Sequence, residues 1–288
     1  MKKIIVPVDF SATAENAASF AAELAVFYHA DLYLYHAYGT YAPLTEYAWL
    51  VTTGEMQSAA EFEMEKFKEN LASKVKTSLN IETRVESVFL QTGLVDYCAA
   101  VQPDMVVMGL SGKNALTRLV VGSNTIYAIQ HLPYPVLVVP PKAKFIPVRK
   151  LGFACDYNAV IATTPVGPIK KLVKDFNAEL HILNVEATAL VPAEKVEESA
   201  YVAEFFNEFH PEYHTILSQD ITAGINFFAE KTKVDWIVVI PKKHKLVDKL
   251  FKRSQTTDLL YHTTVPVLCI QTLQGQDFHT YYHIHNHL

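Results

Sequence analysis

Glycines that follow an apolar run are the residues of this chain best suited to binding chemistry. The run Met105–Met108 leads into Gly109-Leu-Ser-Gly112, and Gly122-Ser123 follows after nine further residues. A buried strand that ends in such a loop marks the edge where parallel sheets bind ligands. Glycine lets backbone N–H groups approach an anion, and a second such segment begins the helical stretch Thr125–Gln130, whose N-terminus attracts phosphate. This spacing predicts a nucleotide polyphosphate site, while a turn followed by a helix N-cap is the simpler alternative.

Signatures of several enzyme classes are missing from the sequence. It contains neither the G-x-x-x-x-G-K-[ST] loop of ATPases nor the G-x-G-x-x-G pattern of dinucleotide-binding proteins. Ser111 is not predicted to be a nucleophile, because its surroundings are one residue short of the G-x-S-x-G pattern. With no general base recognisable beside the loop, we predict no catalytic residue. Regulation through binding is favoured over an enzyme, and any nucleotide hydrolysis would be slow.

Histidines are concentrated in the last residues of the chain. His283, His285 and His287 alternate, so an extended backbone would place them on one face, where imidazoles can bind Zn²⁺ or Ni²⁺. Chain ends are usually poorly ordered, however. We therefore expect a His-rich tail without a metal, and these three residues are the candidates if a metal does bind.

Composition limits the class of protein. The chain has 288 residues, enough for about two domains, with 50% hydrophobic and 19% charged residues and a net charge of −5. The negative charge argues against nucleic acid and anionic membranes as partners. Three scattered cysteines, Cys98, Cys155 and Cys269, indicate reduced, buried thiols. With no signal peptide and no apolar stretch of about 18 residues, a cytoplasmic protein without a membrane partner is expected.

The two halves of the sequence repeat each other. Ile4–Asp9 corresponds to Leu151–Asp156, and from Gly93, which corresponds to Gly224, the offset stays at 131 residues to the end of each half. A period of this length indicates tandem domains. We expect domains at residues 1–141 and 148–273, joined by the proline-rich linker 140–147, and a tail at 274–288.

Strands and helices alternate along each half. Apolar runs rich in Val, Ile and Leu between helical stretches predict a five-stranded parallel sheet covered on both faces, which is a Rossmann-like, doubly wound α/β fold. Ser11 is expected to cap the first helix. Residues 38–54 are expected to be an insertion, either a lid or loose surface. In the first half we predict strands at 3–8, 31–37, 82–90, 105–109 and 136–139, and helices at 14–29, 56–78, 93–101 and 123–130.

The sequence resembles the universal stress protein family in a tandem two-domain form, over about residues 2–272. The resemblance is carried by Ile5-Val-Pro-Val-Asp9, by His36-Ala37, by the G-x2-G-x9-G-S stretch that begins at Gly109, and by Pro135-Val-Leu-Val-Val139. In ATP-binding members of this family, the glycine motif wraps the ribose and the triphosphate. The resemblance therefore implies ATP as cofactor, with Mg²⁺, and a role in stress response or signalling.

The resemblance also implies which residues hold the nucleotide. Asp9 would lie against the nucleoside and the metal, and the backbone near Ala37 would contact the adenine edge. Backbone amides would bind the phosphates, and Lys113 would either add a charge or remain a solvated loop residue. The expected nucleotide-binding residues are Pro7, Asp9, Ala37, Met108, Gly109, Leu110, Ser111, Gly112, Lys113, Asn114, Ala115, Gly122, Ser123, Asn124 and Thr125.

The second half departs from the glycine pattern. At the constant offset, Ile240, Lys243 and Arg253 stand where the first half has Gly109, Gly112 and Gly122. Pro241 also removes a backbone donor. We therefore expect one nucleotide per chain, bound by the first half. The basic residues Lys242, Lys243, His244, Lys245, Lys249, Lys252 and Arg253 are a solvated face or a site for another anion.

The last strand of each half is expected to pair with the other. Val136–Val139 and Val267–Ile270 are short and apolar and follow a proline, which is typical of a sheet edge open to another strand. The resemblance implies antiparallel pairing of these strands in an internal pseudo-dimer, with a homodimer of chains as a further possibility. Two alternatives to ATP-dependent signalling stay open: a nucleotide-independent interaction scaffold, and a slow ATPase or metal-binding stress protein.

Overall fold

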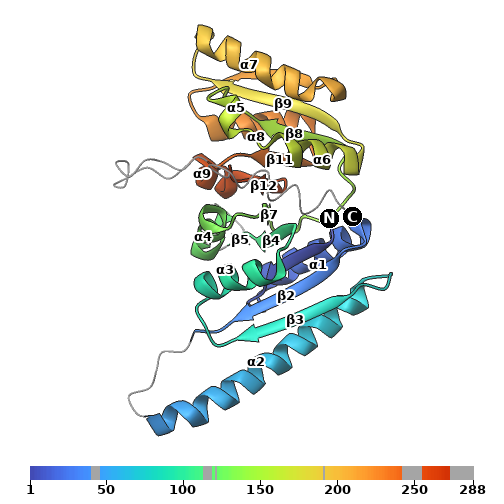
Figure 1. Cartoon of the computed structure of the whole chain (residues 1–288), viewed down its shortest axis with the longest axis vertical. Coiled ribbons are helices and arrows are strands. Elements are labelled where there is room, and N and C mark those ends of the chain that lie inside the picture. Colours follow the sequence, from blue (N-terminus) through green and yellow to red (C-terminus); the bar gives the residue numbers. More distant parts are fainter. Residues whose placement is uncertain (40–45, 113–118, 121, 191, 242–254, 273–288) are drawn as a thin grey trace.

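A single ten-stranded sheet runs through both halves of the protein (Figure 1). The computed structural model describes residues 1–39, 46–112, 119–120, 122–190, 192–241 and 255–272. The strand order is β10-β9-β8-β11-β12-β7-β4-β1-β2-β3, so each half contributes five adjacent strands. This arrangement confirms the predicted tandem Rossmann-like fold.

The first half follows the predicted alternation of strands and helices. Its elements are β1 (Lys3–Pro7), α1 (Ala12–Tyr28), β2 (Asp31–Ala37), α2 (Glu46–Lys74), β3 (Ile81–Glu86), α3 (Leu90–Val101), β4 (Met105–Gly109), β5 (Ser111–Gly112), β6 (Leu119–Val120), α4 (Ser123–His131) and β7 (Val136–Val139). The strands of the large sheet are parallel within this half.

The second half repeats this order with a divided first helix. Its elements are β8 (Lys150–Ala154), α5 (Val160–Thr163), α6 (Val166–Phe176), β9 (Glu179–Glu186), α7 (Ala193–Phe206), the 3₁₀ turn η1 (Asn207–Phe209), β10 (Glu212–Leu217), α8 (Ile221–Thr232), β11 (Trp236–Val239), α9 (Gln255–His262) and β12 (Val267–Cys269). Pro165 separates α5 from α6, because proline offers no N–H group to continue a helix.

The halves meet where β7 and β12 pair antiparallel in the middle of the sheet (Figure 1). Leu137 lies opposite Leu268, with Val138 opposite Val267 and Val136 opposite Cys269. All other described pairs in this sheet are parallel. The predicted antiparallel pairing of the two last strands is therefore confirmed.

Equivalent residues have the same local role in both halves. Asp104 Oδ2 accepts the backbone N–H groups of Lys2 and Lys3 at 2.6 and 3.0 Å. Asp235 Oδ2 accepts those of Arg149 and Lys150 at 2.7 and 2.9 Å. These hydrogen bonds connect the start of β4 to the start of β1 in the first half, and the start of β11 to the start of β8 in the second. The repeat therefore extends to single hydrogen bonds.

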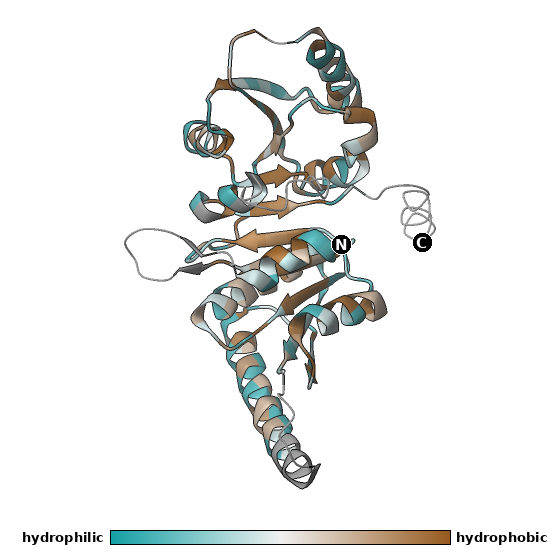
Figure 2. Ribbon diagram, turned by 90° about the vertical axis from the view of Figure 1, so that its left-hand side faces the viewer, coloured by the Kyte–Doolittle hydropathy of each residue, from teal (hydrophilic) through white to brown (hydrophobic). Residues whose placement is uncertain are grey.

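Apolar side chains are buried on both faces of the sheet. On one face α1, α2, α6 and α7 cover the strands, and on the other α3, α4, α8 and α9 do so. Figure 2 shows hydrophobic strands at the centre of the molecule and many hydrophilic residues along α2, which extends beyond the sheet. No helix among the described residues has both the length and the apolar character needed to cross a membrane.

Several predicted boundaries were wrong. Helix α2 begins at Glu46, so most of the expected insertion 38–54 is helical. No proline lies between Pro43 and the end of α2 to interrupt the helix, and Gly54 destabilises a long helix by only about 1 kcal/mol. Strand β3 ends at Glu86, whereas the predicted strand ended at residue 90, and α3 begins at Leu90, whereas the predicted helix began at residue 93. Residues 111–112 and 119–120 pair as a two-stranded ribbon inside the predicted glycine loop.

Candidate functional site

The carboxyl ends of β1, β2 and β4 gather several of the predicted site residues at one edge of the sheet. Pro7, the last residue of β1, lies beside Tyr35 of β2, and Ala37 ends that strand. On its other side β1 pairs with β4, which leads through Met108 to Gly109. Parallel strands bind ligands outside these ends.

Asp9 lies just beyond β1 and connects this edge to α1. Its Oδ1 accepts hydrogen bonds from Ser11 Oγ at 2.6 Å and from Ser11 N at 3.1 Å. Ser11 Oγ in turn accepts the N–H of Ala14 at 3.2 Å, which is the predicted N-cap. Phe10, between them, has a φ of 59°, so the backbone turns sharply here. The exposed carboxylate is thereby held over the first turn of α1.

Aromatic rings lie beside Ala37 in an arrangement that was not predicted from the sequence. His36 Nδ1 lies 2.7 Å from the carbonyl oxygen of Val8, which fixes the imidazole across the ends of β1 and β2. The Phe10 ring lies 4.4 Å from the imidazole and the Tyr38 ring 6.2 Å, measured between centroids. Such a group of rings offers flat apolar surface next to the backbone that was predicted to contact adenine.

Gly109 is required by packing. A Cβ at this position would lie 2.6 Å from Thr13 Cγ2 and 2.7 Å from the carbonyl oxygen of Thr13. The first turn of α1 therefore sits directly on the end of β4. This contact alone explains why residue 109 is glycine. The sequence had instead suggested that glycine lets the backbone approach a phosphate.

Gly122 has the opposite surroundings. It is the N-cap of α4 with an extended backbone (φ −63°), and as glycine it offers no side chain to accept a hydrogen bond from the first turn. A Cβ there would have Thr125 Oγ1, at 4.0 Å, as its nearest neighbour. Ser123 and Asn124 are exposed and Thr125 is buried. Among the described residues, a side chain on residue 122 would thus meet open space beside the first turn of α4.

The loop between these glycines is only partly described. Leu110 is buried and donates its N–H to Val139 at 3.0 Å, which continues the strand pairing past Gly109. Ser111 and Gly112 pair with Val120 and Leu119. Lys113, Asn114 and Ala115 lie outside the described residues, so their expected contact with phosphate stays a prediction.

At the equivalent edge, the second half has a cavity of about 330 Å³. Ile240, at the position of Gly109, forms part of its wall, and Thr164 contributes a buried hydroxyl without a hydrogen-bond partner among the described residues. Pro241 follows Ile240, while Lys243, Arg253 and the other predicted basic residues lie outside the described part, as does the tail with His283, His285 and His287. The further lining residues include Ala154, Cys155, Asp156, Leu183, Val185, Ile225, Val239 and Leu259.

All three cysteines are buried and unbridged, as predicted. Burial raises the pKa of the Cys98 thiol to about 12 and also raises that of Cys269. Thiols with such raised pKa values are protonated at neutral pH and do not act as nucleophiles. Cys98 and Cys269 are therefore core residues.

Sequence reasoning missed one cluster of possible ligands. His181, Glu212 and His214 come from neighbouring strands and bring two imidazoles and a carboxylate together. The sequence does show glutamate and histidine at alternate positions of one strand, Glu212 and His214. This pattern identifies a ligand cluster only when the register with the neighbouring strand, which carries His181, is known.

Known proteins with similar sequences and folds share this architecture. The chain is 26% identical over 147 residues to universal stress protein MJ0531 of Methanocaldococcus jannaschii, covering 50% of this chain and 84% of that protein. A universal stress protein from Archaeoglobus fulgidus has the same fold, with a TM-score of 0.71 at 14% identity over 94% of this chain and 98% of that one. A putative universal stress protein from Pseudomonas aeruginosa gives 0.61 at 15% identity, over 94% and 93%.

The family model of the universal stress protein family matches residues 1–140 and 169–271. The first stretch contains all five large-sheet strands of the first half, and the second contains β9, β10, β11 and β12, while β8 precedes it. The two halves meet at the central β7–β12 pair. The match, the fold and the tandem repeat agree: this chain belongs to the universal stress protein family.

Proposed function

We propose that the first half of the chain binds ATP, and that the bound nucleotide regulates a role in stress response or signalling. The observation that carries this proposal is the N-terminus of α4 at Gly122, where the described residues provide no side-chain cap and leave room for a Cβ, at the same edge as the ends of β1 and β4. First-turn N–H groups and the positive end of the helix dipole favour phosphate. Ser123 adds an exposed hydroxyl as a further donor.

The nucleoside would lie over the ends of β1 and β2. There the backbone of Ala37 would contact the adenine edge, beside the rings of His36 and Phe10. The exposed carboxylate of Asp9, fixed by Ser11, would face the ribose and a Mg²⁺ ion. The donor set fits that metal, since Mg²⁺ prefers oxygen ligands and is commonly bound by one carboxylate together with phosphates. When bound, the ion would neutralise phosphate charge.

We further propose that one nucleotide binds per chain and that the role is regulatory. In the second half, Ile240 and Pro241 replace Gly109 and Leu110, so a bulky side chain and a missing N–H stand in the equivalent loop. We recognise no general base among the described residues of the first-half site. Three buried, unbridged thiols support a reducing compartment such as the cytoplasm.

An interaction scaffold without nucleotide is the second candidate. It is favoured by the contact of Gly109 with Thr13, because packing alone explains that glycine. The two candidates differ at Gly122, where packing requires no glycine.

Calorimetric titration with ATP and Mg²⁺ of the parent and of Gly122→Arg tests the proposal. Arginine is the residue at the equivalent position 253, and its side chain would fill the space in front of α4. Because residue 122 has a negative φ and room for a Cβ, the variant is expected to keep the parent's thermal stability while ATP binding is lost. Gly54→Arg is the matched control, at an exposed glycine whose Cβ position has no other described atom within 4 Å outside its own helix backbone.

Mass spectrometry of nucleotide released from the denatured parent would identify the ligand. Equal ATP affinity in Gly122→Arg and the parent would overturn the proposed site and favour the scaffold. Two equivalent sites per chain would contradict the assignment to the first half.

A further inference from the structure

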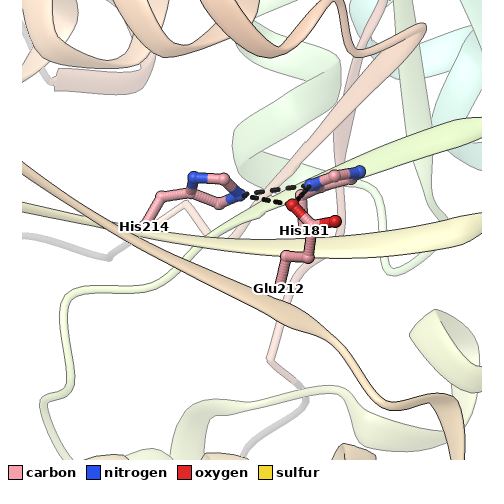
Figure 3. A group of neighbouring side chains, drawn as sticks. All are labelled: His181, Glu212 and His214. Carbon is pink, nitrogen blue, oxygen red and sulfur yellow. Dashed lines mark hydrogen bonds and ion pairs between the residues drawn. The ribbon is translucent and has the colours of Figure 1, made fainter.

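Two histidines and a glutamate converge near the amino ends of β9 and β10. His181 lies on β9, and Glu212 pairs with it in register from β10. His214 is two residues further along β10, so its side chain is on the same face as that of Glu212. Figure 3 shows ring nitrogens of both histidines and a carboxylate oxygen of Glu212 directed toward one another.

The distances between these atoms match those of a metal coordination shell. His181 Nδ1 lies 3.1 Å from His214 Nε2 and 3.5 Å from Glu212 Oε2. His214 Nε2 lies 3.8 Å from the same carboxylate oxygen. Ligands bound to zinc at about 2.0–2.2 Å in a tetrahedron lie roughly 3.3–3.6 Å from one another. A zinc ion fits the three atoms with small side-chain adjustments.

The other ring nitrogen of His181 supports the same interpretation. His181 is 1% exposed, and its Nε2 makes no hydrogen bond within the described residues. Glu179 Oε2 is 3.6 Å away from this Nε2. A metal-bound histidine usually donates its second N–H to a carboxylate, which fixes the tautomer that exposes the ligating nitrogen. If His181 Nδ1 binds the metal, Glu179 is positioned to accept the hydrogen bond from the Nε2–H group of the same ring.

The first half has no such ligand set at the equivalent positions. There Tyr33 of β2 pairs with Glu82 of β3, and Arg84 follows two residues later. Of these three residues, only the carboxylate is a common zinc ligand. The second half thus has histidine at both positions where the first half has tyrosine and arginine.

We propose that His181, Glu212 and His214 bind one Zn²⁺ ion, with water as the fourth ligand. Two imidazoles and one carboxylate suit zinc better than Mg²⁺ or Ca²⁺, which prefer oxygen ligands. The ion would join the outermost strand β10 to β9 at the amino edge of the sheet. The candidate nucleotide edge is at the opposite ends of the strands, so the two sites are independent.

Zinc titration of the full chain tests the proposal, in a background that carries His279→Gln, His283→Gln, His285→Gln and His287→Gln to remove the tail histidines. One zinc ion per chain is expected by calorimetry, and Co²⁺ in its place should give the visible absorption of tetrahedral coordination. His214→Arg, which copies Arg84, should abolish this binding and the rise in melting temperature with zinc. His262→Arg, at an exposed histidine on α9, should bind like the background.

Two further variants keep the test decisive if His214→Arg is poorly folded. Glu212 has a side chain 68% exposed, so Glu212→Gln should fold normally and bind zinc at least about tenfold more weakly. Glu179→Gln should weaken binding by about 10–100-fold. The proposal is wrong if the tail-substituted chain binds no zinc, or if Glu212→Gln and a folded His214→Arg bind it as tightly as that chain.

Discussion

At the scale of single residues, Gly93 is fixed by the side chain that packs against it. Tyr35 extends from β2 across the first turn of α3, and its hydroxyl donates a hydrogen bond to Glu86 Oε2 at 2.8 Å. A Cβ on Gly93 would lie 2.1 Å from that hydroxyl oxygen. Gly224 plays the equivalent part against Val185 in the second half, where a Cβ would be 2.7 Å from Cγ1.

Gly93→Ala is therefore expected to destabilise the protein, although the same change within a helix usually stabilises by about 0.5–1 kcal/mol. The Tyr35 hydroxyl would have to leave Glu86, and overpacking of this kind costs about 1–3 kcal/mol. Urea unfolding gives the free energy of unfolding directly. Gly54→Ala is the matched control, since nothing lies within 4 Å of its Cβ position and it should be neutral or stabilising. Equal stability of Gly93→Ala and the parent would show that Tyr35 is not constrained.

The sequence predicted which residues correspond between the halves, but it did not reveal their partners. The register of Gly93 with Gly224 followed from a constant offset, whereas the contacts with Tyr35 and Val185 depend on how each helix crosses its strand. The cluster of His181, Glu212 and His214 was missed for the same reason, because the ligands are on different strands. Gly109 packs against Thr13, a reason for glycine that the sequence did not contain, while its predicted contact with phosphate stays a prediction.

At the scale of elements, local capping was predictable and helix extent was less so. Ser11 was expected to cap α1, and it does. The early start of α2 at Glu46 was not predicted, because threonine, valine and glycine near that start are weak helix formers. The division of α5 from α6 also escaped prediction, although Pro165 marks it. Elements whose ends depend on one side-chain hydrogen bond are the ones that sequence pattern specifies best.

Ser11→Ala should destabilise the protein by about 0.5–2 kcal/mol, because Ala14 N–H loses its acceptor and Asp9 loses the hydroxyl that it binds. Ser73→Ala is a suitable control, since Ser73 is exposed within α2 and bonds only to a carbonyl of its own helix, Asn70. Thermal unfolding of both variants measures the difference. A Ser11→Ala variant as stable as Ser73→Ala would mean that this cap contributes nothing to α1.

At the scale of the whole molecule, two features join the halves into one body. The β7–β12 pair makes the sheet continuous. Rings from both halves also pack together around Phe145 of the linker: Phe20 lies 5.6 Å from it and 6.1 Å from Trp236, and Phe27 stacks on Phe176 at 5.0 Å. Antiparallel pairing of the last strands was predictable from their apolar edges and the family resemblance. The aromatic contacts were not, because they need the placement of α1 against α6.

This continuity predicts that a charge in the central strand pair will separate the halves. Leu268 is 1% exposed opposite Leu137, so Leu268→Asp would bury a carboxylate without a partner at a cost of several kcal/mol. The variant should expand in small-angle scattering, become sensitive to protease in the linker, and unfold in two calorimetric transitions where the parent unfolds in one. Leu217→Asp, at a 60% exposed leucine on the outermost strand β10, should behave like the parent. If Leu268→Asp stays as compact and as cooperative as Leu217→Asp, contacts outside the β7–β12 pair, the aromatic ones among them, hold the halves together, and the strand pair is a consequence of that packing.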